Sequence, residues 1–203
     1  GLPGVARNIK NPNLMKTEFG WEIDPIGFRN TLREVYSRYR LPIVITENGL
    51  GAYDTLTEDG EVHDPYRITY LREHIKQMQL AITDDVEMMG YCPWSAIDLI
   101  STHEGMKKRY GFIYVDRDEF DLRTLDRYRK DSFYWYKKVI ASNGEDLLPI
   151  SHQRFFNSPF LNDTLPRSVQ NRGKWDSVCG HEQEFGGPKE KVICYDYAKR
   201  GVL

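Results

Sequence analysis

The stretch Ile43-Val44-Ile45-Thr46-Glu47-Asn48-Gly49 decides the fold prediction for this chain of 203 residues. Its first three residues are apolar and β-branched without alternation, which indicates a short strand covered on both faces, as the strands of parallel sheets are. After Thr46 comes a carboxylate, Glu47, and Gly49 opens a polar loop. The sequence therefore predicts a buried strand with an acidic side chain at its carboxyl end.

Helices are predicted on both sides of this strand. Asp24-Pro25 and Asp64-Pro65 each place an Asp at the N-cap and a proline at the first helical position. Apolar residues at helical spacing then predict helices over residues 25–39 and 65–83. A second buried strand is expected over residues 86–91. The alternation of helix and buried strand is typical of a parallel α/β fold.

The rest of the chain divides into a folded part and a tail. After the second strand we expect a loop, a short strand and a last helix with Asp131 as its N-cap. They are predicted over residues 95–109, 112–115 and 132–142. Beyond residue 148, proline, glycine and asparagine are scattered without a sustained period. We therefore assign residues 1–148 to the folded part and residues 149–203 to a loop-rich tail of unknown origin.

Composition argues against several classes of protein. The 28 basic and 30 acidic residues give a net charge of −2, so nucleic acid is not an expected partner. No apolar run reaches the roughly 18 residues of a membrane span, so no membrane partner is expected either. The three cysteines, Cys92, Cys179 and Cys194, are odd in number and suit a reducing cytoplasm. With His181, the last two match no zinc pattern, and we expect neither metal nor cofactor.

Chemically distinctive residues end both predicted strands, where the loops of parallel α/β proteins converge. Glu47 ends the first strand, and the second ends in Tyr91-Cys92-Pro93-Trp94-Ser95. An isolated Glu at this place is as readily a capping or loop acid. A Trp at a strand end is more often a core residue than a ligand platform. Neither strand end alone therefore identifies a site.

Taken together, the two strand ends resemble glycoside hydrolase family one, and its 6-phospho-β-glucosidase branch in particular. The motifs are Thr46-Glu47-Asn48-Gly49 and Trp94-Ser95, and the resemblance extends over about residues 8–147. It implies a (β/α)₈ TIM barrel, of which this chain is the C-terminal portion, with strands seven and eight and their flanking helices. It also implies that Glu47 is the catalytic nucleophile and that Trp94 lines the glycone subsite.

The loop after Trp94 indicates a phosphorylated substrate. Family members that act on unphosphorylated glycosides usually carry a Glu where this chain has Ser101. Without that Glu, no carboxylate at this position repels a phosphate. Ser101, Lys108 and Tyr110 resemble the phosphate clamp of 6-phospho-glycosidases, which combines a hydroxyl, a cation and a phenol. Thr102 is an alternative source of the hydroxyl. Without the resemblance, the basic stretch around Lys108 would be taken for a solvated turn.

The resemblance implies hydrolysis of 6-phospho-β-glucosides with retention of configuration. Retaining glycosidases need a nucleophile and a second carboxylate, the general acid/base, about 5–5.5 Å away. The family carries the second one in an Asn-Glu pair on strand four, and no Asn-Glu pair occurs in this sequence. A complete barrel also takes about 250 residues. We therefore expect a truncated member of the family.

Three hypotheses for function remain open at this point. The first is an enzyme that is active only when the barrel is completed, and the second is a non-catalytic remnant that at most binds a sugar phosphate. The third is a stable domain with no role in sugar chemistry. The expected partners are a phosphorylated β-glucoside and either an N-terminal complementing portion or further copies of the chain.

Overall fold

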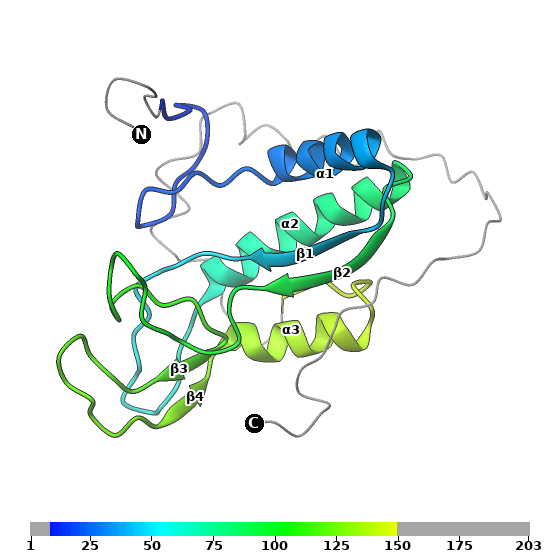
Figure 1. Cartoon of the computed structure of the whole chain (residues 1–203). Helices are drawn as coiled ribbons and strands as arrows, with labels where there is room; N and C mark the ends of the chain where they lie inside the picture. Colours follow the sequence, from blue (N-terminus) through cyan, green and yellow to red (C-terminus); the bar gives the residue numbers. More distant parts are fainter. Residues whose placement is uncertain (1–8, 150–203) are drawn as a thin grey trace. The chain divides into compact units, whose positions relative to one another are not determined.

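The computed structural model describes residues 9–149, which form three helices, a pair of parallel strands and a short antiparallel hairpin (Figure 1). In chain order the elements are α1 (Pro25–Tyr39), β1 (Ile43–Asn48), α2 (Pro65–Thr83), β2 (Met88–Pro93), β3 (Ile113–Val115), β4 (Arg127–Arg129) and α3 (Asp131–Ala141). The predicted tail, with Cys179, His181 and Cys194, lies outside the described residues from residue 150 onward.

The two Asp-Pro signals start helices at the predicted residues, but only one of them works as expected. The Asp24 carboxylate accepts a hydrogen bond of 2.8 Å from the Gly27 backbone N–H at the start of α1. At the start of α2, Asp64 makes no such cap bond. Its carboxylate instead accepts hydrogen bonds from Arg67 and Ser132, because it is turned into a buried cluster of charges.

The strands β1 and β2 pair in parallel, as predicted, with Ile45 opposite Tyr91. The expectation that both faces of these strands are covered is wrong for residues 9–149. Ile45 and Tyr91 are buried, whereas Val44 and Met89 remain 45% and 54% exposed. The covered face is the one toward the helices, and the hydrogen bond between Asn48 and Tyr70 joins β1 to α2. No closed barrel forms within the described range.

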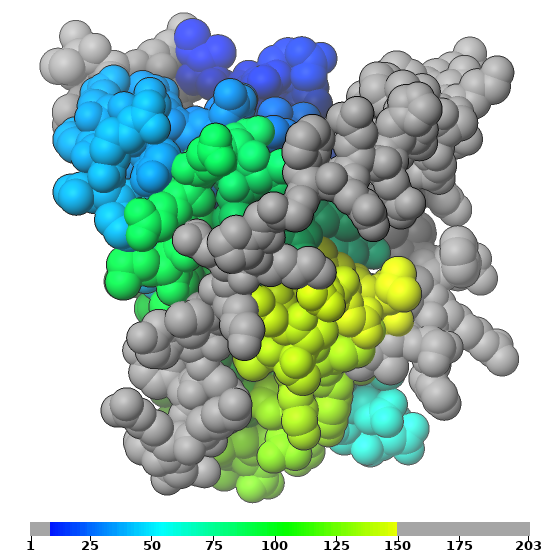
Figure 2. Space-filling model, turned by 90° about the vertical axis from the view of Figure 1, so that its right-hand side faces the viewer, coloured from blue at the N-terminus to red at the C-terminus, as the bar shows by residue number. Residues whose placement is uncertain are grey.

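The helices pack side by side, α1 on α2 and α2 on α3. The helices α2 and α3 carry most of the helical core residues, namely Ile68, Leu71, Ile75, Met78, Trp135 and Val139. The strand β4, which the sequence did not predict, pairs with β3 and contacts α3, whose yellow surface adjoins the yellow-green segment before it in Figure 2. In the described part of the chain, no helix is long and apolar enough to cross a membrane.

The exposed strand face predicts that this chain associates. Unpaired strand edges and apolar side chains beside them template contacts between chains. We therefore expect an apparent mass well above the 23.8 kDa of one chain in size-exclusion chromatography with light scattering. Lysine at Val44 and Met89 should lower it, whereas lysine at Val35, an exposed position on α1, should not. A wild-type chain that elutes as a single monomeric peak would contradict this expectation.

Candidate functional site

The two predicted strand-end residues lie at the same edge of the sheet. Glu47 is the penultimate residue of β1, and the Trp94 backbone N–H just beyond β2 donates to the Asn48 carbonyl oxygen at 2.8 Å. The Glu47 side chain is exposed and has no hydrogen bond or ion pair within residues 9–149. The backbone hydrogen bond between Trp94 and Asn48 therefore places Glu47 near Trp94. The Glu47 carboxylate is accessible to solvent.

The other predicted substrate residues gather around Tyr110. The Tyr110 hydroxyl lies 3.2 Å from the Ser101 hydroxyl, and its ring meets the Trp94 ring edge-on with centroids 6.4 Å apart. The Lys108 ammonium lies 5.5 Å from the same Tyr110 ring. Thr102, the alternative hydroxyl, is exposed and faces His103 instead, with 3.0 Å between Oγ1 and Nδ1. The structure thus brings together four of the five predicted residues, while Glu47 joins them only through Asn48.

Lys108 has an aromatic environment that the sequence did not predict. Its ammonium lies 3.7 Å from the centroid of the Trp21 ring and 4.9 Å from that of Phe19. The residue is only 3% exposed. Gly51 makes room for it, because a Cβ at that position would lie 2.5 Å from the Lys108 side chain. No local periodicity signals a contact between two such distant segments, and the contact was therefore not predicted.

A buried charge network lies beneath these loops. We use this name for three acids and three bases, each at most 9% exposed: Asp54, Asp64, Asp98, Arg67, Arg109 and Lys130. The Arg67 guanidinium donates to the Leu50 carbonyl oxygen at 2.8 Å and to the Tyr110 carbonyl oxygen at 3.1 Å. It therefore ties the loop after Glu47 directly to the loop that carries Tyr110.

Opposite charges are paired throughout the buried charge network. Arg67 pairs with Asp54 at 2.9 Å and with Asp64 at 2.8 Å. The Lys130 ammonium bridges Asp54 and Asp98, at 2.7 Å from the latter, and Arg109 reaches Asp98 at 3.0 Å. Each buried cation of the network thus has a carboxylate partner, which is what burial of a charge demands.

Burial and pairing compete in setting the pKa values of the network. Burial raises the pKa of Asp64 to about 6, although the charge of Arg67 opposes the rise. Burial acts in the same direction on Asp54, but the positive charges of Arg67 and Lys130 outweigh it and lower the pKa of Asp54. The pKa of Lys130 is lowered, first by burial and then by the nearby Arg67. Asp54 is therefore ionised at neutral pH, whereas the raised pKa of Asp64 lies within about a unit of neutrality.

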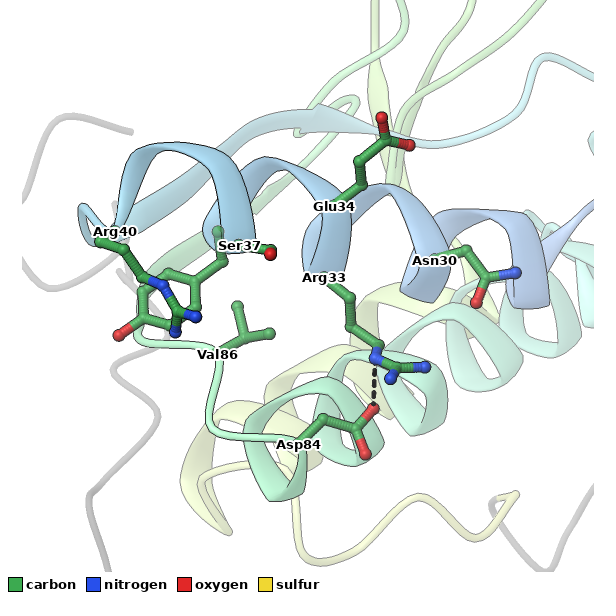
Figure 3. A pocket seen from close by; sticks show the side chains of 8 residues that line it. Asn30, Arg33, Glu34, Ser37, Arg40, Asp84 and Val86 are labelled. Atoms are coloured by element: carbon green, nitrogen blue, oxygen red, sulfur yellow. Dashed lines mark ion pairs between the residues drawn. The ribbon is translucent and has the colours of Figure 1, made fainter.

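A surface pocket of about 370 Å³ lies away from this site. Figure 3 shows its lining: residues of α1 and the α1 end, with Asp84 and Val86 from the turn that precedes β2. An ion pair of 3.2 Å between Arg33 and Asp84 crosses it. These residues precede the strands, so the pocket belongs to the amino ends of β1 and β2. Enzymes of parallel α/β folds bind substrates at the opposite, carboxyl ends.

The residues around Tyr110 follow the carboxyl ends of parallel strands, and a free carboxylate stands beside them. Such a combination is typical of the active sites of α/β enzymes. Within residues 9–149, no group of three or more His, Cys, Asp or Glu side chains is arranged to hold a metal ion. The predicted site residues offer the Glu47 carboxylate, two hydroxyl groups, an ammonium and aromatic rings.

Comparison with known proteins identifies the family. The model of glycosyl hydrolase family 1 matches residues 4–145. The aryl-phospho-beta-D-glucosidase BglC of Bacillus subtilis is 54% identical over 147 residues, which are 72% of this chain and 31% of that protein. The 6-phospho-beta-glucosidase AscB of Escherichia coli is 54% identical over 144 residues, 70% of this chain and 30% of that protein.

A solved structure agrees with these sequence relatives. The family 1 β-glucosidase of Thermotoga maritima superposes with a TM-score of 0.62 at 42% identity, over 68% of this chain and 30% of that one. This chain belongs to glycosyl hydrolase family 1, a family of glycosidases, and its described residues are part of a TIM barrel. It spans about a third of the length of the relatives that it matches.

Proposed function

We propose that this chain is the C-terminal portion of a 6-phospho-β-glucosidase, with β1 and β2 as strands seven and eight of the barrel. Glu47 is the nucleophile, Trp94 lines the glycone subsite, and Ser101, Lys108 and Tyr110 bind the 6-phosphate. The substrate is a 6-phospho-β-glucoside, hydrolysed with retention of configuration. The partner that completes the barrel is an N-terminal portion with the remaining strands.

The observation that carries this proposal is the unpaired charge of Lys108. Arg67, Arg109 and Lys130 are buried and each has a carboxylate within 3.0 Å. Lys108 is as deeply buried, yet it has no salt bridge or hydrogen bond among the described residues. A buried cation without an anion is costly, and a ligand anion would relieve that cost.

The groups near Lys108 suit a phosphate. The Ser101 and Tyr110 hydroxyls lie 3.2 Å apart and each can turn a hydrogen toward a phosphate oxygen. A cation near such donors favours a compact, doubly charged anion through charge-assisted hydrogen bonds. The exposed Thr102 points to His103, which supports Ser101 as the hydroxyl of the clamp.

The relatives support the same substrate class. Those named for phosphorylated β-glucosides are 51–54% identical to this chain, whereas the 1,4-beta-D-glucan glucohydrolase of Thermotoga neapolitana is 46% identical. Ser101 agrees with this order, because a carboxylate at its position would repel a phosphate held by Lys108. We therefore place the chain with the phosphoglucosidases rather than with enzymes for neutral sugars.

The chemistry needs two carboxylates. The Glu47 carboxylate attacks the anomeric carbon while an acid protonates the departing glycosidic oxygen, and a glycosyl ester forms on Glu47. Water, deprotonated by the same acid/base group, then attacks the ester, releases 6-phosphoglucose and restores Glu47. The acid/base group comes from the complementing portion of the barrel. Glu47 contributes the nucleophile, and its backbone position is fixed by the hydrogen-bonded strand β1.

A second candidate function is binding of a sugar phosphate without hydrolysis. It is favoured because the residues proposed to bind the sugar phosphate, Trp94, Ser101, Lys108 and Tyr110, all lie within one short stretch of this chain. Turnover of a chromogenic 6-phospho-β-glucoside by the chain with its complementing portion separates the two functions. Hydrolysis supports the enzymatic function. Binding of glucose 6-phosphate without hydrolysis of the chromogenic substrate supports the second candidate function.

Replacing Lys108 with Ala should weaken the binding of glucose 6-phosphate by about 10- to 100-fold. The loss corresponds to the 1.5–3 kcal/mol that a hydrogen bond to a charged group typically contributes. Isothermal titration calorimetry of the full chain measures it, with unphosphorylated glucose as the comparison ligand. Lys107→Ala is the matched control, because Lys107 is 54% exposed and paired with Glu104 at 3.1 Å. Equal losses for both ligands, or for both variants, would rule out the clamp.

A further inference from the structure

One short segment of the chain lies against the Lys108 ammonium and places two aromatic rings beside it. This segment, residues 16–22, is called the cover turn below. Its ends are joined by the bridge between Lys16 and Glu22, and the Thr17 backbone N–H donates to the Trp21 carbonyl oxygen at 2.7 Å. Gly20, with a φ of +73°, reverses the chain between Phe19 and Trp21. The turn thereby presents both rings toward the ammonium.

The cover turn is held in place by contacts with the loop after β1. The Phe19 ring lies on the Tyr53 ring, with centroids 4.6 Å apart. The Tyr53 backbone N–H donates to the Glu18 carboxylate at 2.7 Å. Trp21 is 53% exposed, although its ring centroid lies only 3.7 Å from the Lys108 ammonium. Trp21 is therefore partly exposed to solvent, while one face of its ring lies against the Lys108 ammonium.

The position of the Trp21 ring explains how the structure tolerates an unpaired buried cation. The face of an indole ring is electron-rich and attracts an ammonium, so Trp21 provides a weak substitute for an anion. Lys108 is 3% exposed in this arrangement, so little of its side chain is open to a ligand while the rings stay in place. An anion that binds Lys108 closely therefore competes with the cation–π contact.

We propose that Trp21 is a specificity-determining residue that competes with the phosphate for Lys108. This inference rests on the proposed role of Lys108 in binding the 6-phosphate. A phosphate forms charge-assisted hydrogen bonds that exceed the lost cation–π contact. A neutral sugar offers no such replacement and leaves the cover turn in place. Trp21 therefore lowers affinity for all ligands at this position, and only an anion overcomes the cost.

The test compares the full wild-type chain with Trp21→Leu and Trp21→Phe. Inorganic phosphate and glucose 6-phosphate are the probes in calorimetry at constant ionic strength. Leucine removes the aromatic face, so we expect both probes to bind about fivefold more tightly, because the competing closed state is lost. Phenylalanine keeps a weaker ring and should give an intermediate value. An affinity of Trp21→Leu that is equal to or below that of wild type would overturn the inference.

A second measurement does not depend on the variants. In the wild-type chain, the Lys108 ε-methylene hydrogens should show nuclear magnetic resonance shifts displaced by the Trp21 ring current. Saturation with inorganic phosphate should move these shifts toward ordinary lysine values, as the ammonium leaves the ring. Binding that depends on Lys108 while these shifts stay unchanged would sink the role of Trp21 and spare the phosphate site. Binding of neither probe by wild type or Trp21→Leu would instead reject the phosphate site itself.

Discussion

Replacing Glu47 with Gln should lower turnover of a chromogenic 6-phospho-β-glucoside by several orders of magnitude. The assay needs the chain together with a complementing N-terminal portion of the barrel. Glutamine keeps the size of the side chain but cannot form the glycosyl ester, so the covalent step is lost while binding is kept. The Michaelis constant should therefore change far less than the turnover number.

Two further variants separate loss of the nucleophile from loss of structure. Glu58→Gln is the matched control, because Glu58 is an exposed acid of the loop after β1 and its replacement should leave turnover unchanged. Glu47→Ala should recover activity with added azide, which attacks the anomeric carbon from the vacated side and releases an α-glycosyl azide. Near-normal turnover in Glu47→Gln would show that another residue is the nucleophile.

The sequence predicted the helices better than the sheet. The proline start signals placed α1 and α2 at the residues where the structure has them, because these signals are local. The strand β4 and the start of α3 at Asp131 were missed. Lys130, the N-cap of α3, is buried because it pairs with Asp54 and Asp98, which are 76 and 32 positions away. No local pattern encodes such a contact.

The candidate site shows the same difference between what a local pattern predicts and what it does not. Ser101, Lys108 and Tyr110 lie close together in the chain, so a resemblance over one loop was enough to select them. Trp21 was missed, since its contact with Lys108 joins segments that only the fold brings together. The expected coverage of both strand faces also failed, because burial of Val44 depends on neighbours that residues 9–149 do not supply.

Arg67 is the central member of the buried charge network, and replacing it should strongly destabilise the fold. Arg67→Met keeps the length of the side chain but leaves Asp54 with Lys130 alone and Asp64 without a cation. Breaking a buried pair in this way typically costs about 3–5 kcal/mol of the free energy of unfolding. Urea denaturation followed by circular dichroism measures the change.

The matched control for Arg67→Met is Arg38→Met. Arg38 is 64% exposed and pairs with Glu34 at 3.1 Å one helical turn away. Exposed pairs of this kind contribute about 0.2–1 kcal/mol, so the control should stay close to wild type. Arg67 also holds the carbonyl oxygens of Leu50 and Tyr110, and its loss should weaken glucose 6-phosphate binding, which Arg38→Met should not do.

The cost of Arg67→Met should depend on pH in a direction that identifies Asp64. Burial already raises the pKa of Asp64 to about 6 in the folded chain, against about 3.9 in an unfolded one. Loss of the Arg67 charge raises it further. An acid with a raised folded pKa stabilises the fold below its unfolded pKa and loses that contribution as pH rises through the folded one. The loss of unfolding free energy in Arg67→Met, relative to wild type, should therefore be largest near pH 8 and smaller near pH 5. A deficit that stays constant over this range, or grows toward low pH, would mean that Asp64 is not the group left unpaired.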